Sequence, residues 1–182
     1  MTASQPPCEQ QPTIDVLTLG GTIDKIYSPK SACLEVGAPF IGEISSFLRL
    51  QVSLQIKEIT RKDSLDLDDG DRQLLLEAVE RSGSARIVVT HGTDTLLDSA
   101  AFLASRLDFA LLRKAVVFTG SFVPGCIDAR EAAFNLGFAL AVAQTQPPGI
   151  YVAIGGHAYL ANEVVKDTEL QRFIGAGIEE EF

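Results

Sequence analysis

Short apolar blocks alternate along the chain with segments in which apolar residues recur at three- and four-residue intervals. The blocks have the length and β-branched content of buried strands and occupy residues 13–19, 52–59, 87–90, 113–119 and 150–154. The spacing between them predicts helices at residues 41–50, 70–82, from Thr93 onward and at residues 129–143. Strands that alternate with helices predict an α/β fold, a three-layer domain whose parallel sheet carries helices on both faces.

Three segments fall outside this alternation. Residues 1–12 are polar and contain three prolines, which predicts a flexible N-terminal arm ahead of a single domain at residues 13–182. Residues 24–39 contain Pro29, Gly37 and Pro39, which predicts a loop or a short hairpin over the carboxyl end of the first strand. A loop of this length often covers a binding site. For the tail from His157 onward, we expect partly helical structure.

Composition narrows the class of protein. The net charge is −9 and basic residues do not cluster, so we expect no nucleic-acid partner and no membrane partner. The three cysteines are scattered without the spacing of a zinc site or a disulfide framework, which indicates a reducing, cytoplasmic location. We therefore expect no metal and no cofactor, and a neutral or zwitterionic small molecule as the ligand.

Polar groups follow four of the predicted strands. They are Thr22, the segment Lys62-Asp63-Ser64, the pair Thr93-Asp94, and Ser121 after Gly120. Because the carboxyl ends of parallel strands share one edge of a sheet, these groups should meet where ligands bind in such folds. For Thr93-Asp94 taken alone, the alternative is the N-cap of a helix.

Familiar catalytic motifs are absent. The sequence has no phosphate-binding GxGxxG or GxxxxGK[ST] motif and no GxSxG nucleophile motif, and neither histidine has an evident Ser or Cys partner. A threonine hydroxyl is then the remaining nucleophile, and it needs a base because a free hydroxyl is a weak nucleophile. A desolvated lysine held near a carboxylate could supply that base.

Four segments resemble the motifs of the bacterial-type L-asparaginase/glutaminase family. They are Thr18-Leu-Gly-Gly-Thr-Ile23, Val89-Thr-His-Gly-Thr-Asp-Thr95, Phe118-Thr-Gly-Ser121 and Ala133-Phe-Asn-Leu136. The resemblance spans residues 13 to about 167 and implies a fold like the N-terminal α/β domain of that family. It also implies hydrolysis of a side-chain amide, with release of ammonia through a covalent acyl-enzyme.

The resemblance implies roles for individual residues. Thr22 would be the nucleophile, Lys166 the base that acts through Thr93, and Asp94 the group that binds the substrate's α-amino group. Tyr27 is the only nearby candidate for the family's loop tyrosine, because Leu34 stands near the expected place. Substrate contacts would come from Gly21, Asp63, Gly92 and Ser121, and backbone N–H groups near Thr93 and Thr22 would bind the oxyanion.

The chain departs from the family in the segment that binds the substrate's α-carboxylate. Arg61 stands where many members have a serine, so Arg61, Lys62 or Ser64 would bind the carboxylate instead. The second domain of full-length relatives has no counterpart here, which predicts weaker substrate binding and a homo-oligomer, a dimer or tetramer. We expect an asparaginase that acts poorly on glutamine. The alternatives are an amidase for another side-chain amide and an inactive amino-acid-binding or sensing module.

Overall fold

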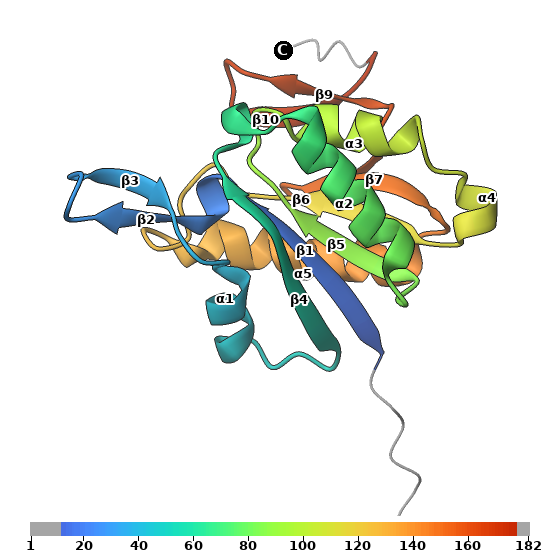
Figure 1. Cartoon of the computed structure of the whole chain (residues 1–182), viewed down its shortest axis with the longest axis horizontal. Coiled ribbons are helices and arrows are strands. Elements are labelled where there is room, and N and C mark those ends of the chain that lie inside the picture. The colour runs from blue at the N-terminus through green and yellow to red at the C-terminus, as the bar shows by residue number, and fades with distance from the viewer. Residues whose placement is uncertain (1–11, 178–182) are drawn as a thin grey trace, which may run out of the picture.

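The computed structural model describes residues 12–177 and contains a six-stranded sheet. The strand order is β4-β1-β5-β6-β7-β8, in which the first five strands are parallel and β8 pairs antiparallel to β7. The strands are β1 (Thr13–Gly20), β4 (Ser53–Lys62), β5 (Arg86–Thr90), β6 (Ala115–Thr119), β7 (Gly149–Ile154) and β8 (His157–Leu160). The predicted parallel sheet is confirmed. Figure 1 shows that its strands run side by side, with α5 behind them.

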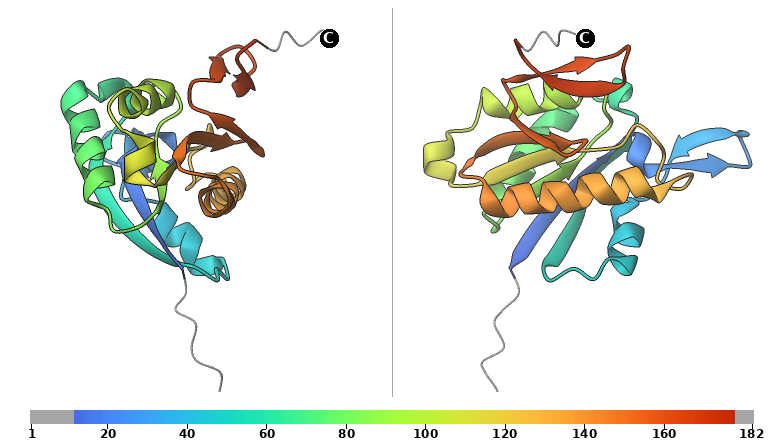
Figure 2. Two further views of the ribbon diagram at one scale, coloured as in Figure 1. Left: turned by 90° about the vertical axis from the view of Figure 1, so that its right-hand side faces the viewer. Right: turned by 180° about the vertical axis from the view of Figure 1, so that it is seen from behind.

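Helices cover both faces of the sheet, as the alternation predicted. They are α1 (Ile41–Phe47), α2 (Asp69–Arg81), α3 (Leu96–Ala104), α4 (Phe109–Leu112) and α5 (Ala129–Thr145). The sidedness follows from the strands, whose alternate residues enter two separate cores. Leu17 and Val89 pack with α2 and α3, whereas Val16 and Val88 pack with α1 and α5. Figure 2 shows the resulting layers edge-on.

Two small hairpins lie beyond the carboxyl edge of the sheet. The segment after β1 forms a 3₁₀ turn, η1 (Thr22–Asp24), and then the hairpin β2 (Lys25–Ser28) and β3 (Cys33–Val36). This hairpin, one of the two predicted outcomes for residues 24–39, projects from the body of the domain (Figure 1). The second hairpin consists of β9 (Val164–Asp167) and β10 (Arg172–Gly175).

Several predicted boundaries were wrong. The tail from His157 is not helical in the described residues but forms β8, β9 and β10, because β-branched residues such as Val164 and Val165 pair in strands. Helix α3 begins at Leu96, two residues after Asp94, and α1 ends at Phe47. Strand β4 extends to Lys62, and the turn η2 (Ser64–Asp66) follows it. Most of the predicted N-terminal arm lies outside the described residues.

Two glycines lead to opposite predictions for stability. Gly137 is exposed inside α5 and has open space around its Cα, so Gly137→Ala should raise the free energy of unfolding by about 1 kcal/mol. Gly21 has φ 85° and ψ −168°, a conformation essentially restricted to glycine, and a methyl group there would lie 2.3 Å from the backbone of Gly92. Gly21→Ala should therefore lower the free energy of unfolding by about 3 kcal/mol or more. Urea titration measures both values, and equal effects of the two substitutions would contradict this account.

Candidate active site

The loops that follow β1, β5 and β6 touch through their glycines. A Cβ on Gly21 would lie 2.3 Å from both the Cα and the nitrogen of Gly92, so these two backbones are in direct contact. A Cβ on Gly120 would likewise lie 2.3 Å from the carbonyl oxygen of His91. Side chains at these positions would force the loops apart. The glycines thus bring three strand ends to one point, as the parallel topology predicted.

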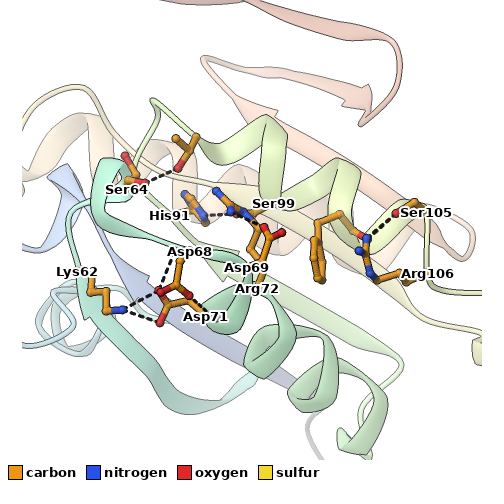
Figure 3. A network of polar contacts seen from close by, with 12 residues as sticks. Lys62, Ser64, Asp68, Asp69, Asp71, Arg72, His91, Ser99, Ser105 and Arg106 are labelled. Atoms are coloured by element: carbon orange, nitrogen blue, oxygen red, sulfur yellow. Dashed lines mark hydrogen bonds and ion pairs between the residues drawn. The ribbon is translucent and has the colours of Figure 1, made fainter.

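The two threonines of the predicted site follow directly after the touching glycines. Thr22 opens the turn η1 and is partly exposed, and Thr93 is buried between β5 and α3. Thr93 and Asp94 are not the cap of α3, since the N-cap position belongs to Thr95. The Thr95 hydroxyl donates a 2.6 Å hydrogen bond to the carbonyl of Ser64, which ties this loop to η2 (Figure 3). Thr93 and Asp94 are therefore available for other contacts.

Lys166 reaches this point from β9. Its Nζ donates to Thr93 Oγ1 at 3.2 Å and lies 2.5 Å from Asp94 Oδ1. The lysine side chain is only 12 % exposed, and its Nζ also lies 5.5 Å from the centre of the Phe122 ring. The hydroxyl, carboxylate and amine predicted at the strand ends are thus in hydrogen-bond contact. They belong to elements that are more than seventy residues apart in the sequence.

Asp63 and Ser64 lie close to the glycine contact. Asp63 caps η2 through Leu65 N–H and forms a 2.7 Å ion pair with Lys25, which lowers the pKa of the Asp63 carboxyl. Ser64 is buried, and a Cβ on Gly92 would lie 2.6 Å from its Cβ and Oγ. Of the candidates for the α-carboxylate contact, Ser64 is the one packed against the Thr93 loop.

Arg61 and Lys62 make other contacts. Arg61 forms a bidentate pair with Glu58 on its own strand. Lys62 donates to both carboxylate oxygens of Asp71, at 2.9 and 2.7 Å, and Asp71 in turn belongs to the capping box of α2 (Figure 3). The physical reason is that both residues lie on the extended end of β4, not in a loop, so each side chain meets the nearest acid beside that strand. The structure therefore gives neither residue to the site.

Ser121 and Tyr27 complete the set of predicted residues. Ser121 is buried, and its hydroxyl donates a 2.6 Å hydrogen bond to the carbonyl of Val123 within its own loop. Tyr27 lies on the projecting hairpin, paired with Leu34, and the residue is 61 % exposed. The structure does not bring Tyr27 into contact with Lys166 or Thr93, because strand pairing carries it away from the body of the domain.

His91 holds the peptide that precedes Thr93. Its Nδ1 lies 2.8 Å from the carbonyl oxygen of Gly92, which can only accept, so Nδ1 carries the proton. Its Nε2, 2.8 Å from Ser99 Oγ, then accepts from that hydroxyl, which itself accepts from Arg72 Nε at 3.3 Å (Figure 3). Burial lowers the pKa of His91 to about 4, and the charge of Arg72 adds to the lowering. A neutral histidine thus fixes the Gly92–Thr93 peptide, whose N–H points away from the ring.

Asn135 is a site element to which the sequence analysis gave no role. Its Nδ2 donates to the carbonyl of Gly120 and its Oδ1 accepts from Gly155 N–H, both at 2.9 Å. It thereby ties together the loops after β6 and β7. The signal was available, because an amide between Ala132 and Leu136 interrupts an otherwise apolar helix face, and a buried amide requires partners.

Comparisons with known proteins agree with this geometry. The family model "Asparaginase, N-terminal" matches residues 13–173. The chain belongs to the asparaginase family. It is 32 % identical over 159 residues to the L-asparaginase of Thermococcus kodakarensis, a match that covers 83 % of this chain and 46 % of the relative. The chain thus spans about half the length of the curated relatives it matches.

Solved structures of the family share the fold. The thermostable L-asparaginase of Thermococcus kodakarensis superposes with a TM-score of 0.79 at 28 % identity, over 90 % of this chain and 51 % of that one. A probable cytoplasmic L-asparaginase from Campylobacter jejuni superposes with a TM-score of 0.77 at 25 % identity, over 91 % of this chain and 53 % of that one. Within residues 12–177, no helix is long and apolar enough to span a membrane, and no cluster of His, Cys, Asp and Glu could hold a metal ion.

Because His91 is buried in its neutral form, we expect acid to lower the free energy of unfolding. The pKa of His91 is about 4 in the folded state and about 6.5 in the unfolded state. The unfolded state therefore binds the extra proton first as the pH falls, and stability is lost from about pH 6.5 down to pH 4. Relative to His91→Gln, the wild type should lose about 2 kcal/mol of unfolding free energy between pH 7.5 and pH 5. His157→Gln, at an exposed histidine, is the matched control, and an equal change of slope in both variants would contradict the prediction.

Proposed function

We propose that this chain is an amidohydrolase that converts L-asparagine to L-aspartate and ammonia, with glutamine as a poor substrate. The observation that carries the proposal is the contact of Lys166 with both Thr93 and Asp94 beside the Thr22 turn. Membership of the asparaginase family supports the proposal. So do the L-asparaginase relatives, of whose length this chain covers about half.

The proposed chemistry assigns one step to each group. The substrate's α-ammonium binds Asp94 and replaces Lys166 there, and the Lys166 ammonium, now without its carboxylate, releases a proton to solvent. The neutral Nζ then accepts the proton of Thr22 Oγ1 through the Thr93 hydroxyl. Thr22 Oγ1 attacks the side-chain amide carbon, and the Thr93 N–H, directed away from His91, is a donor for the developing oxyanion. The C–N bond then breaks, and the proton held by Lys166 passes through Thr93 to the leaving nitrogen, which departs as ammonia. Water hydrolyses the remaining ester and regenerates Thr22.

Lys166 provides the sharpest test of this function. Lys166→Ala should lower kcat for ammonia release by roughly 10²–10⁴-fold, the usual contribution of a general base. Lys166→Arg keeps a cation beside Asp94 but cannot accept a proton, so it should be equally impaired. Thr22→Ala should release no ammonia, and Lys30→Ala, at an exposed hairpin lysine, should match the wild type. Full activity of Lys166→Arg would show that the lysine is only a counter-ion and would contradict its role as the base.

Weak substrate binding is expected even if turnover is efficient. Arg61 and Lys62 are engaged by Glu58 and Asp71, so neither is free to bind the substrate's carboxylate.

We also propose a homo-oligomer, because large apolar side chains are exposed on both hairpins and on η2: Tyr27, Leu65 and Leu170. The KM for L-asparagine should be millimolar and should fall as protein concentration promotes association. A micromolar KM at low protein concentration would contradict this prediction.

The exposed position of Tyr27 and the engaged cations also favour a second candidate, an inactive module that binds an amino acid. Calorimetric binding of L-asparagine without ammonia release would support that candidate over the amidohydrolase. Ammonia release from a different side-chain amide, but not from asparagine, would instead indicate another amidase. We retain the cytoplasmic location as a proposal, supported by the reducing character of the cysteine pattern.

A further inference from the structure

Asp24 is a buried acid two residues after Thr22, at the junction of η1 and the β2–β3 hairpin. It is 2 % exposed. Its N–H donates to the carbonyl of Gly21 at 3.1 Å, which closes the turn that carries Thr22. Its own carbonyl accepts from Gly37 N–H at 2.8 Å, beyond the far strand of the hairpin. One residue thus joins the Thr22 turn to both ends of the hairpin.

The Asp24 side chain anchors the same junction to the body. Its Oδ1 accepts from Phe40 N–H at 2.8 Å, immediately before α1. The Phe40 ring is fixed in the core, since a Cβ on Gly125 would lie 2.1 Å from it. The hairpin is a separate two-stranded sheet that projects from the domain, so its position depends on contacts at its base (Figure 1). Besides Asp24, one of these contacts is the ion pair of Lys25 with Asp63.

The carboxyl of Asp24 has a poor environment for a negative charge. Its Oδ2 is buried and finds no hydrogen-bond partner among the described residues. The charged groups that act on it are Glu58 and Arg61 on β4, and these pair with each other. Lys25, its neighbour on the hairpin, is engaged by Asp63. Burial is the main cause that raises the pKa of Asp24 to about 6; the charge of Glu58 also raises this pKa, whereas the Phe40 N–H and the charge of Arg61 lower it.

We propose that Asp24 is a positioning residue: its protonated carboxyl holds the Thr22 turn and the base of the hairpin closed, and its ionisation loosens them. Ionisation leaves a buried anion with one backbone donor, and opening of the hairpin base lets water solvate that anion. The consequence for Thr22 rests on the proposed function, but the opening itself does not.

The sign of the effect follows from linkage. In the closed state the pKa is about 6, whereas a solvated aspartate has a pKa near 3.8. The closed state therefore binds the proton more tightly, and closure is firmest at low pH and weakens as the pH rises to about 6. Between pH 5 and pH 7.5, the equilibrium constant for opening should rise about tenfold.

Hydrogen–deuterium exchange of the full chain tests the proposal without substrate. Peptides that cover residues 22–40 should show about a tenfold rise in the opening constant from pH 5 to pH 7.5, after correction for intrinsic exchange. Asp24→Asn keeps an acceptor for Phe40 N–H but does not titrate, so its opening constant should not change with pH. Glu35→Gln, which removes an exposed acid from the same hairpin, should retain the wild-type rise.

Two outcomes would overturn the proposal: no rise in the wild type, or the same rise in Asp24→Asn. Asp24→Ala serves as a second variant, because it removes the acceptor and should raise exchange at Phe40 at both pH values. Failure of the proposed function would appear separately, as absence of ammonia release from a chain whose hairpin still opens with pH as described. If both hold, Asp24→Asn should also alter the pH profile of kcat, which a merely structural residue would not change.

Discussion

The contact between the backbones of Gly21 and Gly92 is the constraint on which the site depends. Thr22 belongs to the loop after β1 and Thr93 to the loop after β5, and these loops meet only because neither glycine carries a side chain. Gly120 permits the same approach to the loop after β6. The sheet brings the strand ends to one edge, but strand spacing alone leaves room for side chains between the loops. The glycines remove that space and bring hydroxyl groups and backbone N–H groups together.

Two buried titratable groups flank this contact and respond to pH in opposite directions. His91 is buried as a neutral base, so acid destabilises the folded state through it. Asp24 is buried as an acid, so the same fall in pH favours the folded state. Their effects on global stability partly cancel between about pH 4 and pH 6.5. They do not cancel locally, because His91 fixes the Thr93 peptide, whereas Asp24 fixes the Thr22 turn. The two halves of the site are therefore expected to loosen at opposite ends of this range.

Much of the fold and the central contacts of the site could be predicted from the sequence. The strand blocks and helical spacing predicted the layered α/β arrangement because each element buries one consistent face. The strand-end groups predicted that Thr22 and Thr93 would lie at one edge, and the family resemblance implied that Lys166 would meet Thr93. Such inferences depend on topology and motif spacing, which do not require the exact ends of elements.

The details that could not be predicted depend on where elements end and on pairing between distant residues. Lys62 was expected in a loop, but β4 continues through it and directs it to Asp71, whose role in capping α2 is visible only in three dimensions. Tyr27 was placed by its distance along the chain, whereas pairing with Leu34 determines its actual position. The tail from His157 was expected to be partly helical, but its described residues pair as β8, β9 and β10, and this pairing depends on partners outside each short segment.

Both hairpins of the carboxyl edge are held partly by titratable polar groups, which sets them apart from the core. The β9–β10 hairpin contacts the body through Lys166 and Asp94, with Phe173 packed beside Phe122. The β2–β3 hairpin is anchored through Asp24 and Lys25. An apolar anchor would hold equally well with or without a ligand, because its strength depends on buried area. A polar anchor instead changes when one of its groups gains or loses a proton or a partner, as Asp24 does on ionisation and as Lys166 would if another cation bound Asp94. The elements around the site can therefore respond to pH while the sheet beneath them stays fixed.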